Sequence, residues 1–255
     1  MIRVENVSKA FAGKQVLNNI SVNFEPGKTN LIIGQSGSGK TVLLKSIIGL
    51  HSVDSGSIFF GDRNFTTMKV KDTRLIRQEM GMVFQAGALF DSSSVVENVM
   101  FPMDMFTDWT PKEKLKRAEF CLERVNLHKV NHLYPSEISG GMQKRVAIAR
   151  AIALNPKYLF CDEPNSGLDP KTSILIDNLI REITQEYNIT TVINTHDMNS
   201  VMEIGDTIVF LYNGYKEWVG NKDNILKVAE GHVSDFVFAT QLMKKFKRSL
   251  DGNNG

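Results

Sequence analysis

Apolar and β-branched residues occur along this chain in short runs, separated by turn residues and by longer stretches of helical periodicity. Four runs in the first sixty residues predict strands: 2–7, 16–24, 29–33 and 57–60. Three more runs follow beyond residue 156: 157–161, 189–194 and 207–212. Asn213-Gly214 then precedes an alternating run at 215–219, and this residue pair is typical of a two-residue hairpin turn.

The helical stretches lie between these strands. Apolar residues recur at helical spacing after residue 41 and again after Ser139, which has the side chain of a typical N-cap. Residues 110–113, Thr-Pro-Lys-Glu, form another helix start, with a capping Thr, a Pro at the first position and a Glu three residues after the Thr. Residues 169–170, Asp-Pro, open a further helix. Because strands and helices alternate, we expect an α/β core with a mainly parallel sheet.

Composition narrows the class of protein. The chain has 255 residues, 42% hydrophobic and 23% charged, which suits one large globular domain or a core domain with an inserted subdomain. The net charge of +2 gives no electrostatic reason to expect nucleic acid as a partner. The N-terminus lacks the apolar core of a signal peptide, and no apolar run approaches the roughly 20 residues that span a bilayer. We therefore expect a protein outside the bilayer that could dock on a membrane partner.

The segment after the predicted strand 29–33 matches the phosphate-loop pattern G-x-x-x-x-G-K-[ST] without a gap: Gly34, Gln35, Ser36, Gly37, Ser38, Gly39, Lys40 and Thr41. The glycines allow backbone N–H groups to turn toward phosphate oxygens, and the following helix adds partial positive charge at its N-terminus. Lys40 would neutralise the β- and γ-phosphates, and the Thr41 hydroxyl would ligate Mg²⁺. A glycine turn that merely precedes a helix is the alternative, but the motif stands in the strand–loop–helix context that it requires.

Two carboxylates end the apolar run at 157–161. Asp162 and Glu163 are costly in that place unless a cation or a water needs them. Asp162 would hold Mg²⁺, directly or through water, and Glu163 would orient the attacking water and act as general base. A solvated acidic loop is the alternative for this pair.

His196 follows the apolar run at 189–194. Ligands in open α/β sheets bind at the carboxyl ends of the strands, where the phosphate loop and the carboxylate pair are also predicted to lie. His196 could therefore hydrogen-bond the γ-phosphate and the attacking water. An ordinary surface or core histidine is the alternative.

A second anion site is predicted at the start of the helix after residue 138. Ser139, Gly140 and Gly141 expose backbone N–H groups at a helix N-terminus, where the helix dipole favours negative charge. One chain therefore has two phosphate-binding ends. Both ends can bind one nucleotide only if two copies of the chain face each other.

In this order, these motifs resemble those of the ATP-binding cassette (ABC) ATPases, from residue 2 to the hairpin around Trp218. The resemblance rests on the phosphate loop, Gln85, the Ser-Gly-Gly signature, the carboxylate pair, residues 166–169 (SGLD) and His196. It implies ATP and Mg²⁺ as ligands and ATP hydrolysis as the activity. It also implies a P-loop (RecA-like) α/β core with an N-terminal antiparallel β subdomain and an inserted α-helical subdomain at about residues 86–155.

The resemblance assigns roles that the residues alone do not reveal. Phe11 would stack on the adenine with Val16 beside it, although a core aromatic near a turn is the alternative for Phe11. Gln85 would be the switch residue that touches Mg²⁺ and the attacking water. Asp169 would lie in the loop that crosses the interface of an ATP-closed homodimer. The family signature usually ends in Gln where this chain has Met142, so we expect ATP binding to persist without a polar side chain there.

The resemblance also implies a domain organisation and a location. Residues 1–230 would form a single ABC ATPase domain and 231–250 a short C-terminal extension. Apart from the resemblance, we expect residues 251–255 to form a disordered tail, as is common at chain ends. The chain would lie peripherally on the cytoplasmic side of the inner membrane and power an integral-membrane permease. The segment from Gln85 to Phe90 would form a groove for a short cytoplasmic helix of that permease. The alternative is that Leu89, Phe90 and Val95 only fill the helical subdomain.

Within the family, residues 87–102 (GALFDSSSVVENVMFP) and the Ser-Gly-Gly-Met signature are similar to the ATPases of bacterial phospholipid-transport systems, the Mla/Mkl type. The C-terminal segment 233–246 is similar to that type as well. This resemblance implies phospholipid transport for cell-envelope lipid asymmetry and an MCE-domain lipid-binding subunit in the complex. The alternative is the ATPase of an amino-acid or other small-solute importer, which shares the ENV…P pattern.

Two further classes of protein fit less well. A non-transport ABC protein would carry two fused cassettes or long coiled coils, but this chain has one phosphate loop, no sustained heptads and no basic patch. A regulatory module that binds nucleotide without hydrolysing it would not need Glu163 and His196. Neither the transported molecule nor the direction of transport follows from these motifs.

Overall fold

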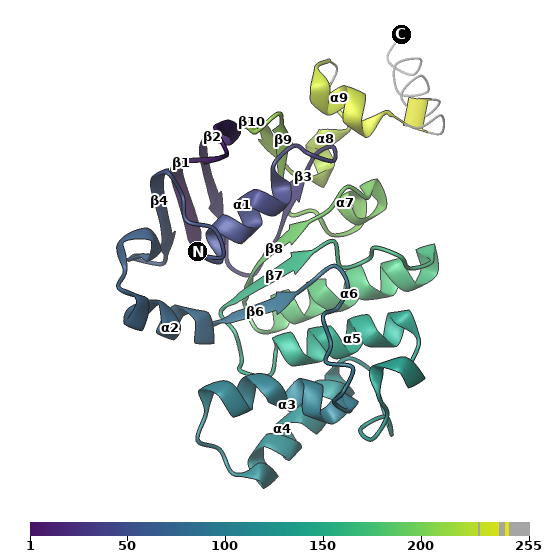
Figure 1. Ribbon diagram of the computed structural model, residues 1–255. Helices are drawn as coiled ribbons and strands as arrows, with labels where there is room; N and C mark the ends of the chain where they lie inside the picture. The colour runs from purple at the N-terminus through teal and green to yellow at the C-terminus, as the bar shows by residue number, and fades with distance from the viewer. Residues whose placement is uncertain (229, 240–242, 245–255) are drawn as a thin grey trace.

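The computed structural model describes residues 1–228, 230–239 and 243–244 (Figure 1). An antiparallel sheet with the strand order β2-β1-β4-β5 is built from the N-terminal strands: β1 (Ile2–Phe11), β2 (Lys14–Phe24), β4 (Ser55–Phe60) and β5 (Arg63–Asn64). A larger sheet has the order β10-β9-β3-β8-β7-β6: β3 (Thr29–Ile33), β6 (Met80–Val83), β7 (Tyr158–Asp162), β8 (Thr190–Asn194), β9 (Thr207–Tyr212) and β10 (Tyr215–Gly220). Its strands are parallel except for the β9–β10 hairpin, which confirms the predicted α/β core.

The alternation of side chains along the buried strands produces a core on each face of the larger sheet. Ile32 of β3 packs with α1 (Lys40–Ile47) and with the antiparallel sheet. Its neighbours Leu31 and Ile33 point to the other face and pack with residues of three helices: α5 (Gly140–Ala151), α6 (Pro170–Glu186) and α7 (Met198–Ile204). Because both faces are covered, β3, β7 and β8 are buried along their whole length, and β7 and β8 end in the polar residues Asp162 and Asn194.

A helical region lies at the end of the molecule away from the antiparallel sheet (Figure 1). It contains α3 (Val95–Phe106) and α4 (Pro111–Arg124), which pack on α5. The predicted helix start at residues 110–113 is confirmed, because Thr110 and Glu113 form a capping box at the start of α4. The remaining helical segments are short: α2 (Val70–Gln78), α8 (Lys222–Ile225), α9 (His232–Val237), and the 3₁₀ turns η1 (Phe65–Thr67) and η2 (Pro135–Glu137).

Several elements differ from the prediction. The hydrophobic pattern does not predict β6, which is four residues long and contains Gly81. A Cβ atom at Gly81 would lie 2.3 Å from the carbonyl oxygen of Ala151, so this weak strand former is required where α5 crosses the sheet. The strand predicted at 157–161 lies one residue further on, which makes Asp162 the last residue of β7.

Among the described residues, no helix has the length and apolar character needed to traverse a bilayer. The predicted extension at 231–250 includes α9. Its residues 240–242 and 245–250 lie outside the described residues, and so does the predicted tail 251–255.

Candidate active site

The phosphate-loop segment connects β3 to α1. Gly34, Gly37 and Gly39 have φ angles of 147°, 81° and 104°, in the left-handed region that favours glycine. A Cβ atom at Gly34 would lie 2.3 Å from the carbonyl oxygen of Leu211, so no side chain fits at this turn. The backbone can therefore turn tightly at the N-terminus of α1, as a phosphate-binding loop requires.

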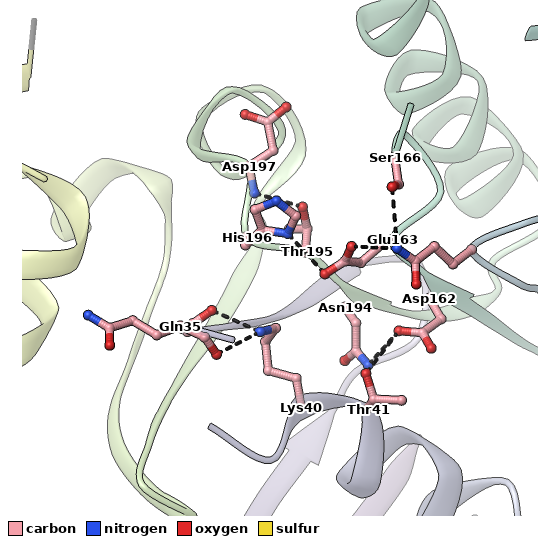
Figure 2. A network of polar contacts seen from close by, with 12 residues as sticks. Gln35, Lys40, Thr41, Asp162, Glu163, Ser166, Asn194, Thr195, His196 and Asp197 are labelled. Carbon is pink, nitrogen blue, oxygen red and sulfur yellow. Dashed lines mark hydrogen bonds and ion pairs between the residues drawn. The ribbon is translucent and has the colours of Figure 1, made fainter. Parts of the chain in front are cut away.

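Lys40 is buried beside this loop, with 7% of its surface exposed. Its ammonium donates to the carbonyl oxygens of Gly34 at 2.9 Å and Gln35 at 3.0 Å (Figure 2). Burial lowers the pKa of Lys40, while the carboxylates of Glu163 and Asp162 act in the opposite direction. A desolvated cation held at the mouth of the loop can bind phosphate oxygens strongly.

The carboxylate of Asp162 lies next to the start of α1. Its Oδ1 accepts hydrogen bonds from the Thr41 hydroxyl at 3.5 Å and from Nδ2 of Asn194 at 3.1 Å (Figure 2). The structure thus brings together two of the predicted Mg²⁺ ligands from β7 and α1. The sequence reasoning missed Asn194, although it ends the apolar strand β8 in the same way that Asp162 ends β7.

Glu163 follows β7 with a φ angle of 47°, an uncommon conformation for a residue other than glycine. Its Oε1 lies 2.9 Å from Nδ1 of His196, and its Oε2 accepts a hydrogen bond from Nε2 of Gln85 at 3.2 Å. The same Gln85 nitrogen donates to the hydroxyl of Ser166 at 3.3 Å. Figure 2 shows Glu163 and His196 facing each other from two separate segments, and Gln85 belongs to a third. The three residues that the sequence predicts as catalytic therefore form one cluster.

Two cations on α5 fix the segment that carries Gln85. The ammonium of Lys144 donates to the backbone oxygen of Gln85. The guanidinium of Arg150 donates to the carbonyl oxygens of Gly87 and Ala88, each at 2.7 Å. Burial lowers the pKa of both cations. The sequence reasoning missed them, and their only signal is that they are cations on the buried side of a helix.

The residues at this point fit a Mg²⁺ ion. Thr41, Asp162 and Gln85 carry hydroxyl, carboxylate and amide oxygens, which are the ligands that Mg²⁺ prefers. The hydroxyl of Ser38 and Oδ1 of Asn194 are buried without hydrogen-bond partners, although such groups normally have one. No group of three His, Cys, Asp or Glu side chains in the described part of the chain could hold a metal. The donor set therefore suits a Mg²⁺ that also takes oxygens from a phosphate ligand.

The signature residues lie in a different cavity of the same chain. Ser139 caps α5 by accepting a hydrogen bond from the backbone N–H of Met142 at 3.3 Å. Gly140 and Gly141 form the first turn, and together with Ser139 and Asp169 they line a cavity of about 580 Å³. The phosphate-loop cavity, about 750 Å³, shares no lining residue with it. It is lined by residues predicted for the site, with few others: Val16, Gln35, Ser36, Gly37, Gly39, Lys40, Thr41, Gln85, Glu163 and His196.

Three further residues take places that their sequence context did not reveal. Phe11 is 40% exposed at the end of β1, with its ring edge-on to His51, and it does not line the phosphate-loop cavity as Val16 does. It is therefore not a core aromatic. Met142 packs its side chain against the core around α5 and does not line the signature cavity. Phe236 of α9 lines the phosphate-loop cavity, a position that the sequence reasoning did not predict.

The segment after Gln85 borders a shallow apolar groove of about 390 Å³ beside β6 and α3. Phe84, Phe90 and Phe101 line it, and the rings of Phe90 and Phe101 are 4.7 Å apart. Leu89 is not part of this lining and packs on the core instead. The predicted docking segment is thus divided between a groove side and a core side.

These features define a class of protein. A phosphate loop between a parallel strand and a helix, with a carboxylate at the end of another strand of the same sheet, is the arrangement of P-loop nucleoside triphosphatases. The family model described as ABC transporter matches residues 17–166, and the chain belongs to this family.

Comparisons with known proteins support this assignment. The methionine import ATP-binding protein MetN of Clostridium acetobutylicum is 38% identical over 226 residues, which cover 88% of this chain and 70% of that protein. The glutamine transport ATP-binding protein GlnQ of Escherichia coli is 40% identical over 227 residues, which cover 89% of this chain and 94% of that protein. The dimeric structure of a bacterial ABC transporter cassette, 32% identical, superposes with a TM-score of 0.80 over 87% of this chain and 99% of that one.

Family membership fixes the general activity. The chain is an ATP-binding subunit of an ABC transporter and an ATPase that uses Mg²⁺. Such cassettes dimerise and pair with a membrane permease at the cytoplasmic face of the membrane. The cassette of the dimeric neighbour has also been solved in a post-hydrolysis state bound to ADP and phosphate. That structure is 32% identical to this chain and superposes on it with a TM-score of 0.79, over 87% of this chain and 99% of that one.

Proposed function

We propose that Glu163 is the general base of ATP hydrolysis and that Gln85 and His196 position it. The observation that carries this proposal is the Glu163 carboxylate, held 2.9 Å from His196 and 3.2 Å from Gln85 beside the phosphate loop. A carboxylate in this place can take a proton from the water that attacks the γ-phosphorus, while ADP leaves with the bond to the γ-phosphate broken. Lys40 would neutralise the β- and γ-phosphates, and His196 would also donate to the γ-phosphate.

The remaining predicted residues would bind the nucleotide and the metal. Thr41, Asp162 and Gln85 would hold Mg²⁺, which when bound neutralises charge on the phosphate oxygens. The backbone of the phosphate loop, residues 34–39, would donate to those oxygens. Val16, which lines the cavity, would pack against the adenine, and Phe11, exposed at the end of β1, would stack on it.

A second copy of the chain would complete the site. Ser139, Gly140 and Gly141 line a cavity that shares no lining residue with the phosphate-loop cavity of the same chain, so we assign them to the nucleotide of the partner chain. In a face-to-face dimer, the N-terminus of α5 would donate to the γ-phosphate bound by the partner. Asp169, which caps α6 beside the signature, would lie at that interface.

Glu163→Gln tests the catalytic proposal. The variant keeps the size and most hydrogen bonds of the side chain but cannot accept a proton, so turnover should fall by about 10²–10⁴-fold. ATP binding, measured by equilibrium titration, should remain. Glu5→Gln, which changes an exposed carboxylate on β1, serves as the matched control and should hydrolyse ATP at the wild-type rate. Turnover of Glu163→Gln close to wild type would contradict the proposal.

We further propose that the groove beside Phe90 is the docking site of the permease. It is apolar, it lies next to Gln85, and it exposes aromatic side chains that the core does not need. A short amphipathic helix of a membrane subunit fits a groove of this kind. A permease bound there would be coupled to Glu163 in two steps. Lys144 and Arg150 hold the backbone of the docking segment, and the Gln85 side chain of that segment contacts Glu163.

For the transported molecule, we propose a small polar solute such as an amino acid. The support comes from relatives at 37–41% identity, which are named as methionine import and glutamine transport ATP-binding proteins. A relative from Fusobacterium nucleatum at 36% identity is named as a phosphonate import ATPase.

Phospholipid transport with an MCE-domain subunit is the second candidate. It is favoured by the sequence of residues 87–102, which borders the docking groove, and by Met142 in the signature. The methionine, glutamine and phosphonate relatives named above do not carry such a function in their names, so this candidate rests on the sequence resemblance.

Cells in which Glu163→Gln replaces the wild-type chain distinguish the two candidates. Small-solute import predicts lost uptake of one radiolabelled amino acid or phosphonate, with unchanged membrane lipid distribution. Phospholipid transport predicts altered phospholipid in the outer leaflet of the envelope and normal uptake of all solutes tested.

A further inference from the structure

A buried carboxylate lies behind the catalytic cluster and outside its predicted chemistry. Asp177 is on α6 and is 2% exposed. Its partners are neutral side chains: Nδ2 of Asn165 donates to Asp177 Oδ1 at 2.7 Å, and Ser200 forms a second hydrogen bond. Burial raises the pKa of Asp177 to about 6; the two hydrogen bonds oppose this rise, and the charges of Asp197 and Glu203 add to it.

The two partners of Asp177 belong to the segments that carry the catalytic residues. Asn165 lies two residues after Glu163 and directly before Ser166, whose hydroxyl accepts from Gln85. Ser200 lies on α7, four residues after His196. Nδ2 of Asn165 also donates to the Ser200 hydroxyl at 3.1 Å, which closes a triangle of side chains between the two segments.

The rest of α6 shows how unusual this carboxylate is. Most other buried positions of the helix are apolar, among them Ile176, Ile180 and Ile183, and Thr184 is buried but uncharged. A carboxylate is costly at such a depth unless a specific contact requires it. Oδ1 of Asn165 is buried without a hydrogen-bond partner, so this amide leaves its oxygen unpaired while its nitrogen contacts Asp177 and Ser200. The hydrogen bonds of the triangle therefore join the two segments, although Oδ1 of Asn165 has no partner.

We propose that Asp177 is a positioning residue for ATP hydrolysis: through Asn165 and Ser200 it holds the segment of Glu163 and the segment of His196 in register with each other. This inference rests on the proposed catalytic role of Glu163. Asp177 does not line the phosphate-loop cavity, and it acts by fixing the carboxylate–imidazole contact of 2.9 Å. Because the backbone of Glu163 has an uncommon φ angle, this contact is sensitive to small shifts of the loop.

Steady-state ATP hydrolysis by the purified full chain tests this inference. Asp177→Ala should lower kcat by about 10–100-fold, because a displacement of about 1 Å at a reacting group has an effect of this size. The KM for ATP should stay within about twofold, because Lys40 and the phosphate loop are not attached to the triangle. Asp177→Asn keeps an oxygen that can accept from Asn165 and should recover most of the lost rate.

Two further variants separate positioning from general stability. Thr184 is a second buried polar residue of α6, and its hydroxyl forms hydrogen bonds with Ile180 and Thr191. Thr184→Ala should lower the melting temperature and leave kcat unchanged. Asn165→Ala cuts the triangle in a half-buried loop, so the fold is preserved and kcat should fall as in Asp177→Ala. The kcat of the double variant Asp177→Ala/Asn165→Ala should be within about twofold of that of either single variant, because all three variants break the same hydrogen-bonded link.

Wild-type kcat in Asn165→Ala, or equal losses of kcat in Thr184→Ala and Asp177→Ala, would overturn the inference. The reference in the same assay is Glu163→Gln. If that variant turns over normally, the proposed role of Glu163 fails. If it is inactive while Asp177→Ala and Asn165→Ala are normal, only the positioning role fails.

Discussion

Lys40 and Asp177 are both almost fully buried, and burial moves their pKa values in opposite directions. It lowers the pKa of the Lys40 ammonium and raises that of the Asp177 carboxyl, since a low-polarity environment favours the neutral form of each group. Lys40 has two carboxylates nearby that keep its charge favourable, whereas the charged neighbours of Asp177 are themselves acidic. The titration of Asp177 should therefore be visible in the stability of the fold.

The pH dependence of unfolding should report this shift. The pKa of Asp177 is raised from 3.8 to about 6 in the folded chain, so its contribution to stability is fully present below pH 3.8 and is lost as the pH rises through 6. Asp177→Asn does not titrate at this position. Between about pH 4.5 and 7.5 the free energy of unfolding of the variant, relative to wild type, should therefore increase by on the order of 2 kcal/mol. Urea unfolding of both proteins measures it, and a constant difference across this range would contradict the assignment.

Among the elements, the loop between β6 and α3 has two sides with different roles. The groove side carries Phe90, which is 41% exposed, and the core side carries Leu89. Asn98 of α3 fixes the loop by bonding both backbone groups of Phe90, at 2.8 and 3.1 Å. A charge on the groove side should therefore disturb docking without disturbing the fold.

Phe90→Glu and Leu89→Glu form a matched pair for this idea. Phe90→Glu should weaken pull-down of the co-expressed permease by roughly tenfold or more, with an unchanged melting temperature, because it places a carboxylate in an apolar contact. Leu89→Glu should instead lower the melting temperature of the isolated chain by roughly 5 °C or more, because the carboxylate is forced against the core. Full pull-down of a stable Phe90→Glu variant would exclude the groove as the docking site.

The sequence predicts those helices and strands that begin or end at a capping, phosphate-binding or carboxylate residue. The phosphate loop, the strands that end in Asp162 and Asn194, and the caps of α4, α5 and α6 all have local signals of fixed spacing. β6 escapes prediction because it is short and its Gly81 is required by α5 rather than by strand propensity. The Asp177 triangle escapes because its three members come from separate segments, and only the packed fold brings them together. Leu89 and Phe90 could not be told apart for the same reason.

For the molecule as a whole, the separation of the two phosphate-binding ends is the decisive feature. The phosphate-loop cavity and the signature cavity lie on one chain without a shared residue. A solved neighbour of this chain is itself a dimer. A two-fold arrangement would place the signature of each copy against the phosphate loop of the other and produce two equivalent composite sites.

The most direct test of this account is the ATPase rate of a one-to-one mixture of Ser139→Arg and Lys40→Ala chains. Each variant alone should be inactive, because every site in its homodimer lacks either the signature or the phosphate-loop lysine. In a mixed dimer, the intact phosphate loop of Ser139→Arg faces the intact signature of Lys40→Ala, so one site is complete. The mixture should therefore recover about one quarter of the wild-type rate, since half of the dimers are mixed and each has one of two sites. A rate no higher than the sum of the two separate variants would contradict the composite site.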